Sequence, residues 1–182
     1  GFEKPAEDFI VVAPVEGKLS DILRLLDRKP LGFASALGVN PLAIGGDAKG
    51  TIDVRFLLTP HVRMDDVDIR AEADLSRFAW RKGLFGLDLS EGRFKLAVDK
   101  KGMALAGETR LGDELAALRW NEAFGPISGP RRTLDVKTRF NVDTMAAAGF
   151  DIRQHMTGAF GADLKITGTD DGRTQIDGVY DL

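Results

Sequence analysis

The stretch that decides the fold is Val67-Asp-Ile-Arg-Ala-Glu-Ala-Asp-Leu75, in which apolar and charged residues alternate without a break. Successive side chains of a β-strand point to opposite faces, so this pattern predicts a strand with one apolar and one charged face. The same alternation recurs in Thr51–Phe56, Arg93–Val98, Leu134–Phe140 and Asp163–Ile166. The sequence predicts many such strands and few helices, so the central question is what covers their apolar faces.

Turn residues between the alternating segments predict that consecutive strands pair as antiparallel hairpins. The turns are expected at Ser90–Gly92, Asp99–Gly102 and Thr169–Gly172. The predicted fold class is mainly β: an antiparallel meander that forms a curved, groove-like or partly open sheet, with two or three short helices at an edge or end.

The N-terminal part predicts a strand at Asp8–Ala13 and then two short helices. Ser20 is the expected N-cap of a helix that runs to Arg28, and a second helix is expected from Pro30 to Leu37, where Gly38 ends it. Two helices this short need tertiary packing to persist. An apolar stripe is expected to hold them over an end or edge of the sheet, formed by Ile22, Leu25, Leu26, Phe33 and Leu37.

One internal boundary is predicted where Pro126, Gly129 and Pro130 interrupt the pattern. Residues 1–125 then form a first β-unit with a helical insertion at about 20–37, and residues 131–182 begin a second, incomplete unit. Residues 36–54 align with residues 147–166 when one inserted residue is allowed. Gly38 then aligns with Gly149 and Ile52 with Leu164, which favours an internal repeat. The chain is therefore expected to be a piece of a longer protein.

Composition excludes several classes of function. The chain has 182 residues, with 25 basic against 28 acidic side chains interspersed along the strands, which argues against nucleic-acid binding. It has no cysteine, so it has neither disulfides nor a thiolate metal site. No apolar run reaches the roughly 18 to 20 residues that span a bilayer, and no cleavable signal stands at the start.

No catalytic, metal or cofactor site is predicted. His61 and His155 lack the neighbours of a nucleophile-and-base pair, and the Asp65-Asp66-Val67-Asp68 run lacks the glycine and distal glutamate of a calcium loop. Trp80 and Trp120 are expected to pack in the core. Nucleic-acid stacking would need Lys and Arg on the same strand face as the rings, but the alternation places the cations on the opposite face. The chain is therefore not expected to be an enzyme.

Strand parity instead predicts an apolar lining on one sheet face, which Leu118 and Trp120 are expected to join. Its members are Ile52, Val54, Phe56, Val67, Ile69, Phe94, Leu96, Val98, Leu134, Val136, Leu164 and Ile166.

The segment Lys29–Phe56 resembles the helix-to-strand segment of the AsmA-like superfamily, of the YhdP and TamB type. Val67–Leu75, Gly102–Gly107 and Leu118–Phe124 resemble the strands that follow, and Leu134–Leu182 resembles the start of the next unit. The resemblance covers nearly the whole chain, and its motifs are structural rather than catalytic.

This resemblance implies a segment of a periplasm-spanning β-groove that conducts phospholipids between the inner and outer membranes of a Gram-negative bacterium. The implied partners are phospholipid acyl chains, neighbouring β-groove units of the same polypeptide, and the inner membrane through an anchor absent from this chain. Alternation alone also fits a closed β-sandwich that serves as a structural or scaffolding module of the envelope. A hydrolase that uses a carboxylate pair is a third alternative, although no pair is singled out by spacing.

Overall fold

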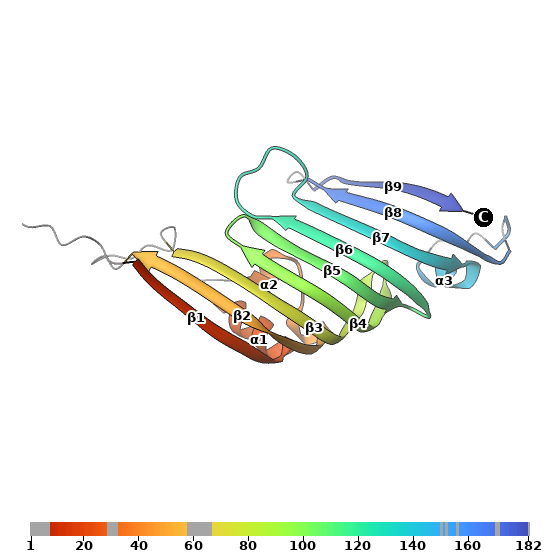
Figure 1. Cartoon of the computed structure of the whole chain (residues 1–182). Coiled ribbons are helices and arrows are strands. Elements are labelled where there is room, and N and C mark those ends of the chain that lie inside the picture. The colour runs from red at the N-terminus through yellow and green to blue at the C-terminus, as the bar shows by residue number, and fades with distance from the viewer. Residues whose placement is uncertain are drawn as a thin grey trace, which may run out of the picture.

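The computed structural model describes residues 8–28, 33–57, 67–149, 151, 153–155, 157–169 and 172–181. Its strands form a single antiparallel sheet in which each strand pairs with the next one along the chain (Figure 1). The nine strands, in chain order and in sheet order, are β1 (Asp8–Lys18), β2 (Ile44–Leu57), β3 (Val67–Leu84), β4 (Leu87–Asp99), β5 (Gly102–Leu111), β6 (Glu114–Ala123), β7 (Arg132–Asn141), β8 (Ala159–Gly168) and β9 (Thr174–Asp181).

The sheet is open. Strands β1 and β9 stand at its two ends and do not pair with each other, so the described strands neither close into a barrel nor split into two packed sheets. The predicted mainly β antiparallel meander is confirmed. Because a meander of hairpins pairs sequence neighbours, local turns are enough to determine the order of the strands.

Two of the three predicted hairpin turns are confirmed. The Asp99 side chain accepts hydrogen bonds from the backbone N–H groups of Lys101 and Gly102, at 2.7 and 3.0 Å, and turns β4 into β5. Thr169 and Gly172 bracket the turn from β8 to β9. The prediction of a turn at Ser90–Gly92 was wrong, because these residues form an irregularity inside β4, where the register with β5 shifts between Ser90 and Arg93.

Strand β1 is longer than predicted, because it continues through Pro14 and Gly17 as far as Lys18. Proline lacks an N–H group and is tolerated in a strand at the edge of a sheet. Within the described sheet, β1 pairs only with β2, where Pro14 lies opposite Thr51. The edge position explains why Pro14 does not end the strand.

The described helices are short and lie on the same side of the sheet (Figure 1). They are α1 (Leu19–Leu26), α2 (Phe33–Ala36), a single 3₁₀ turn η1 (Pro41–Ala43) and α3 (Val142–Ala147). The expected N-cap at Ser20 was wrong: β1 runs directly into α1, Lys18 occupies the cap position without a side-chain hydrogen bond, and Leu19 is buried.

The helical stripe is confirmed in part. Leu37 is buried, and Ile22 packs against the core together with Leu23, whereas Leu25 is 63% exposed and faces away from it. The side chain of Phe33 lies outside the described residues. Two hydrogen bonds connect the end of α1 to α2: Ser35 donates from its backbone N–H and from its hydroxyl to the Asp27 carboxylate, at 2.7 and 2.9 Å.

The sheet continues across the predicted boundary at residues 126–130, because β6 and β7 pair along seven positions from Ala116↔Thr138 to Glu122↔Arg132. The segments of the predicted repeat share their local structure. Each has a helix, then a glycine with positive φ (Gly38 at 71°, Gly149 at 93°), a loop, and a second such glycine at the start of a strand (Gly46 at 114°, Gly158 at 96°). The division into two units stays a prediction.

Candidate functional site: the apolar face and the hairpin tip above it

The register of the strands places the twelve predicted lining residues on one face of the sheet. Directly opposed residues of antiparallel strands share a face, and the pairs Val54↔Ile69, Val136↔Leu164 and Leu134↔Ile166 belong to this set. Other opposed pairs, such as Ala73↔Leu96 and Leu105↔Trp120, place the remaining members on the same face. Trp120 and Leu118 also lie on this face. We call this surface the apolar face and the opposite one the charged face.

Burial divides the apolar face into two zones. Phe94, Val136 and Leu164 are buried, with exposures of 3, 0 and 8%. The other nine predicted residues are half-buried: Ile52, Val54, Phe56, Val67, Ile69, Leu96, Val98, Leu134 and Ile166. Toward the first strands the exposure increases, and Phe9 and Val11, which pair with Phe56 and Val54, are 42 and 48% exposed. Part of the apolar face is therefore covered and part is open to solvent.

One cover of the apolar face comes from its own strands. The hairpin of β3 and β4 curls back over the sheet at the end where the two strands are connected (Figure 1). The register between the two strands becomes irregular around Phe78. The Trp80 ring stacks on the Trp120 ring of β6, with the centroids 6.0 Å apart and the planes at 9°. We call residues 81–88 the hairpin tip. Leu84 and Phe85 of the tip pack against the core formed on the apolar face.

The backbone of this hairpin is unusual. Within the described residues, the non-glycine residues with positive φ are Arg77, Lys82, Phe85 and Glu91, and all four lie in the β3–β4 hairpin. Phe85 and Gly86, with φ of 53° and 72°, are the two central residues of the turn between the paired Leu84 and Leu87. Such a turn prefers asparagine, aspartate or glycine at its first central position, so phenylalanine there is strained by about 1–2 kcal/mol.

Two glycines permit the curl. A Cβ at Gly92 would lie 2.7 Å from the Phe94 ring and 2.9 Å from the Cβ of Phe78, and a Cβ at Gly83 would lie 2.3 Å from the Trp80 ring. All three distances are shorter than an ordinary van der Waals contact, so only glycine lets the rings approach the backbone this closely.

Three hollows lie in a row beneath the tip. The first, about 140 Å³, is walled by Trp80, Leu84, Leu118, Trp120 and other apolar residues. The second, about 500 Å³ and more open, shares Leu84, Arg132 and Leu134 with the first, and its walls are partly polar. The third, about 160 Å³, shares Phe85 and Ile176 with the second and is otherwise walled by Phe140, Met145, Ala148, Leu164 and Tyr180. The walls of the first and third hollows are almost entirely apolar.

A single ion pair interrupts the apolar face in this region. Glu122 and Arg132 lie opposite each other on β6 and β7, and Nε of Arg132 is 2.6 Å from Oε2 of Glu122, whose side chain is 5% exposed. The indole N–H of Trp120 donates to the same carboxylate at 3.0 Å, and the guanidinium lies 5.1 Å from the centre of the Trp120 ring. Arg132 also donates to the backbone oxygen of Leu37, at 3.0 Å, which connects the end of the helical segment to the sheet.

The charged face carries rows of opposite charges across the strands. Arg119, Asp135, Lys165 and Asp177 oppose one another in turn from β6 to β9. At the other end of the sheet, a hydrogen bond from the Arg55 guanidinium lowers the pKa of Asp53. A hydrogen bond from Lys18, followed by one from Arg77, likewise lowers the pKa of Asp47. These charges remain in contact with water, so this face is suited to solvent rather than to an apolar ligand.

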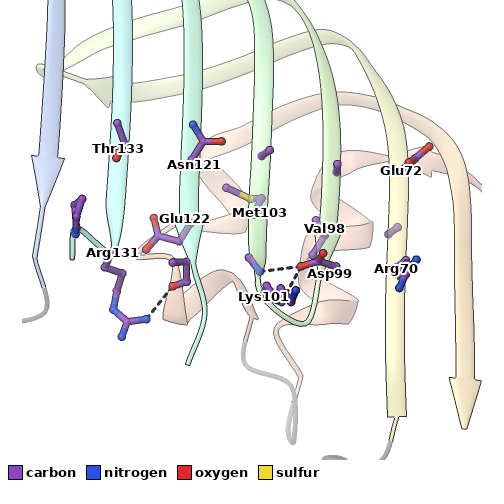
Figure 2. A pocket seen from close by; sticks show the side chains of 16 residues that line it. Arg70, Glu72, Val98, Asp99, Lys101, Met103, Asn121, Glu122, Arg131 and Thr133 are labelled. Atoms are coloured by element: carbon purple, nitrogen blue, oxygen red, sulfur yellow. Dashed lines mark hydrogen bonds between the residues drawn. The ribbon is translucent and has the colours of Figure 1, made fainter. Parts of the chain in front are cut away.

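The ends of β3 to β7 surround a further open hollow of about 430 Å³ (Figure 2). Its labelled side chains are mixed: Met103 and Val98 are apolar, whereas Arg70, Asp99 and Arg131 carry charges. Arg131 donates to the backbone oxygens of Ala123 and Gly125, at 2.9 and 3.0 Å, and thereby fixes the β6–β7 connection. These polar contacts serve the turns around the hollow, so we assign it no ligand.

Other predicted features have structural roles or lie outside the described residues. His155 is exposed, and His61, Asp65 and Asp66 lie outside the described part of the chain. Asp68 pairs with Arg70 at 3.5 Å on the charged face. The described residues contain no group of three or more His, Asp or Glu side chains that could hold a metal ion. No helix in this part of the chain is long and apolar enough to cross a membrane.

Sequence reasoning missed the hairpin tip and the Glu122–Arg132 pair. The signal for the tip was Gly83-Leu-Phe-Gly86, in which two glycines flank two large apolar residues at the centre of a long strand pair. No comparable signal marks the ion pair, because it arises from the register of β6 on β7.

Comparisons with protein-family models, with curated proteins and with solved structures find no match to this chain. They give no support to the resemblance to the AsmA-like superfamily, which stays a prediction from the sequence segments given above.

Proposed function

We propose that this chain is a segment of a periplasmic β-groove protein that conducts phospholipids between the inner and outer membranes of a Gram-negative bacterium. In this proposal the inner-membrane anchor and the neighbouring β-groove units belong to a longer polypeptide. The observation that carries the proposal is the apolar face, which runs across nine strands of one open sheet while charged side chains occupy the other face.

The size of the apolar face supports a ligand. Nine strands about 20 Å long and roughly 4.8 Å apart present on the order of 800 Å² on each face. Exposed apolar patches on ordinary monomers cover only a few hundred Å². The half-buried zone around Ile52, Val54 and Ile69 lies on β2 and β3, next to the more exposed Phe9 and Val11 of the edge strand β1. An apolar ligand there would remove surface that otherwise stays in water.

An acyl chain suits such a surface because its binding needs no specific polar contact. Each buried methylene contributes about 0.8 kcal/mol, so a long chain gains enough in sum to offset its removal from a bilayer. A lining of Val, Ile, Leu and Phe side chains without charges also lets a chain slide along the strands. The Glu122–Arg132 pair is internally neutralised and so adds little net charge to this face.

A structural module of the envelope is the second candidate. The observation that favours it is the burial of Phe94, Val136 and Leu164 beneath other parts of the chain, which shows that part of the apolar face serves as an ordinary core. In that case the half-buried zone around Ile52, Val54 and Ile69 would pack against protein rather than lipid.

Mass spectrometry of organic extracts from the purified chain tests the proposal, with a soluble protein of similar size purified in parallel as the control. Phospholipid enriched with this chain is expected. The matched variants Val54→Arg and Thr51→Arg each add one positive charge, on opposite faces of β2. Val54→Arg is expected to lower the lipid yield, because a charge on the apolar face must be desolvated when an acyl chain binds.

A thermal melt of both variants separates loss of lipid from loss of fold. Equal lipid yields from the two folded variants, or no enrichment with the wild-type chain, would contradict the conduit and favour the structural module.

A further inference from the structure

Beneath the hairpin tip, three hollows adjoin one another through shared wall residues. The 140 Å³ and 160 Å³ hollows lie at the two ends of the row and share wall residues with the more open hollow between them. A dry apolar cavity of about 150 Å³ accommodates a molecule as large as benzene. Each end hollow is therefore large enough for several methylene groups, and the row as a whole matches an unbranched chain.

The walls of the two end hollows suit an apolar ligand, whereas the more open middle hollow is apolar on one side and is also bordered by charged and hydroxyl side chains, Glu122, Arg131, Arg132, Thr169, Arg173 and Thr174. At one end the walls include the stacked rings of Trp80 and Trp120, and at the other they include Phe85, Phe140 and Tyr180. The polar group that borders the first hollow is Arg132, whose charge is matched by Glu122 at 2.6 Å. An ionised ligand group placed in either end hollow would have no partner of opposite charge that is not already paired in this way.

The conformation of the tip indicates that Phe85 is placed there at a cost. Its φ of 53° is one that a phenylalanine adopts with strain, and asparagine would form the same turn without it. The ring lines both the second and the third hollow, and it is half-buried. Strain held at a residue that borders a cavity is a reason to look for a role of that side chain in binding.

The tip is also joined to the sheet by few backbone hydrogen bonds. The backbone N–H of Gly112 donates to the Asp88 oxygen at 2.9 Å, and Leu84 pairs with Leu87 inside the tip itself. Trp80 and Leu89, which flank the tip, are held more firmly in the sheet and form its base. Trp80 pairs with Ile44 of β2, and Leu89 pairs with Leu111 of β5. This arrangement lets the tip lift while the base stays in the sheet.

We propose that the hairpin tip is a clamp over a binding site for a single unbranched acyl chain, which lies between the Trp80–Trp120 pair and Phe85. The inference deepens the proposed function and depends on it: the chain would be held at one defined position on the apolar face before it moves on. The tip opens at its strained residues, admits the chain, and closes Phe85 against it.

The two tryptophans of the protein provide the test, because both line the first hollow. Dibrominated stearate is titrated into the wild-type chain, since bromine quenches tryptophan fluorescence on contact, and unlabelled stearate serves as the blank. Equilibrium dialysis with radiolabelled stearate measures total binding in parallel. Saturable quenching that follows the dialysis isotherm is expected.

Two matched variants then assign the site. Phe85→Asn relieves the backbone strain and removes the ring, so it is expected to weaken quenching about tenfold while the melting temperature stays the same or rises. Leu115→Asn replaces a large apolar side chain with asparagine on the charged face, where Leu115 is 71% exposed and opposes Arg110, and is expected to leave quenching unchanged.

The possible outcomes separate the clamp from the proposed function. Stearate that binds in dialysis without quenching the tryptophans overturns the clamp and leaves the lipid-binding face in place. Equal quenching in Phe85→Asn and Leu115→Asn also overturns the clamp. Absence of stearate binding in dialysis overturns both. The first and third outcomes are decided by the wild-type chain alone, so the clamp can be overturned even if a variant fails to fold.

Discussion

The ion pair on the apolar face leads to a quantitative prediction about stability. Arg132→Met removes the guanidinium and leaves the Glu122 carboxylate, which is 5% exposed, without its cation. Loss of one partner from a buried ion pair costs about 3–5 kcal/mol of unfolding free energy. We expect a value at or below the lower end, about 2–3 kcal/mol, because the Arg132 side chain is itself 41% exposed and the indole N–H of Trp120 still donates to the carboxylate at 3.0 Å.

The second arm of this experiment removes both charges. In Glu122→Leu combined with Arg132→Met the buried charge is gone, and the remaining cost, about 1–2 kcal/mol, comes from the indole N–H of Trp120 and the backbone oxygen of Leu37, which both lose a hydrogen-bond partner. The double variant is therefore expected to be more stable than Arg132→Met alone. Urea denaturation of the wild-type chain, both single variants and the double variant yields the coupling energy directly.

Lys95→Met is the matched control for this cycle. Lys95 pairs with Asp74 at 2.8 Å on the charged face, but both side chains are mostly exposed, at 85 and 71%. An exposed pair of this kind contributes little that can be measured. The reasoning would be refuted if the effects of the two single variants at Glu122 and Arg132 simply added, or if Lys95→Met were as destabilising as Arg132→Met.

The remaining predictions concern the core, the curl and acid stability. Val136→Ala, at a site with no exposure, is expected to cost about 2 kcal/mol in urea denaturation, and a loss below about 0.5 kcal/mol would contradict the observed burial. Gly92→Ala must displace a ring and is expected to cost about 1–3 kcal/mol, whereas Gly17→Ala meets nothing within 4 Å and should melt with the wild type. Lys18 and Arg77 hold the pKa of Asp47 below 3.8, and Arg153 lowers that of Asp151 to about 2. Each carboxylate therefore stabilises the fold above about pH 4 and loses its contribution as the pH falls through its folded pKa. The difference in unfolding free energy between the wild type and each variant, Asp47→Asn or Asp151→Asn, should be constant above about pH 5 and should shrink in acid. For Asp151→Asn it should disappear only near pH 2. A difference that grows in acid would contradict the assigned pairs.

The alternation of apolar and charged residues determined the face of each lining residue before any contact was known. Val54, Leu96 and Val136 lie on one face because side chains in strands alternate with a period of two, and a one-residue error in register would have exposed all of them. Local turn chemistry such as Asp99–Gly102 also determined the order of neighbouring strands. These features are local, so the sequence alone was enough to predict them.

Tertiary structure alone decided what lies on the apolar face. The stacking of Trp80 on Trp120 depends on a curl that four residues adopt against their backbone preference, and local propensity argues against each of them. The Glu122–Arg132 pair likewise requires β6 and β7 to meet in one register. Alternation specifies which side of a strand is apolar, but it carries no information about which distant segment will cover that side, because coverage depends on packing between residues far apart in the chain.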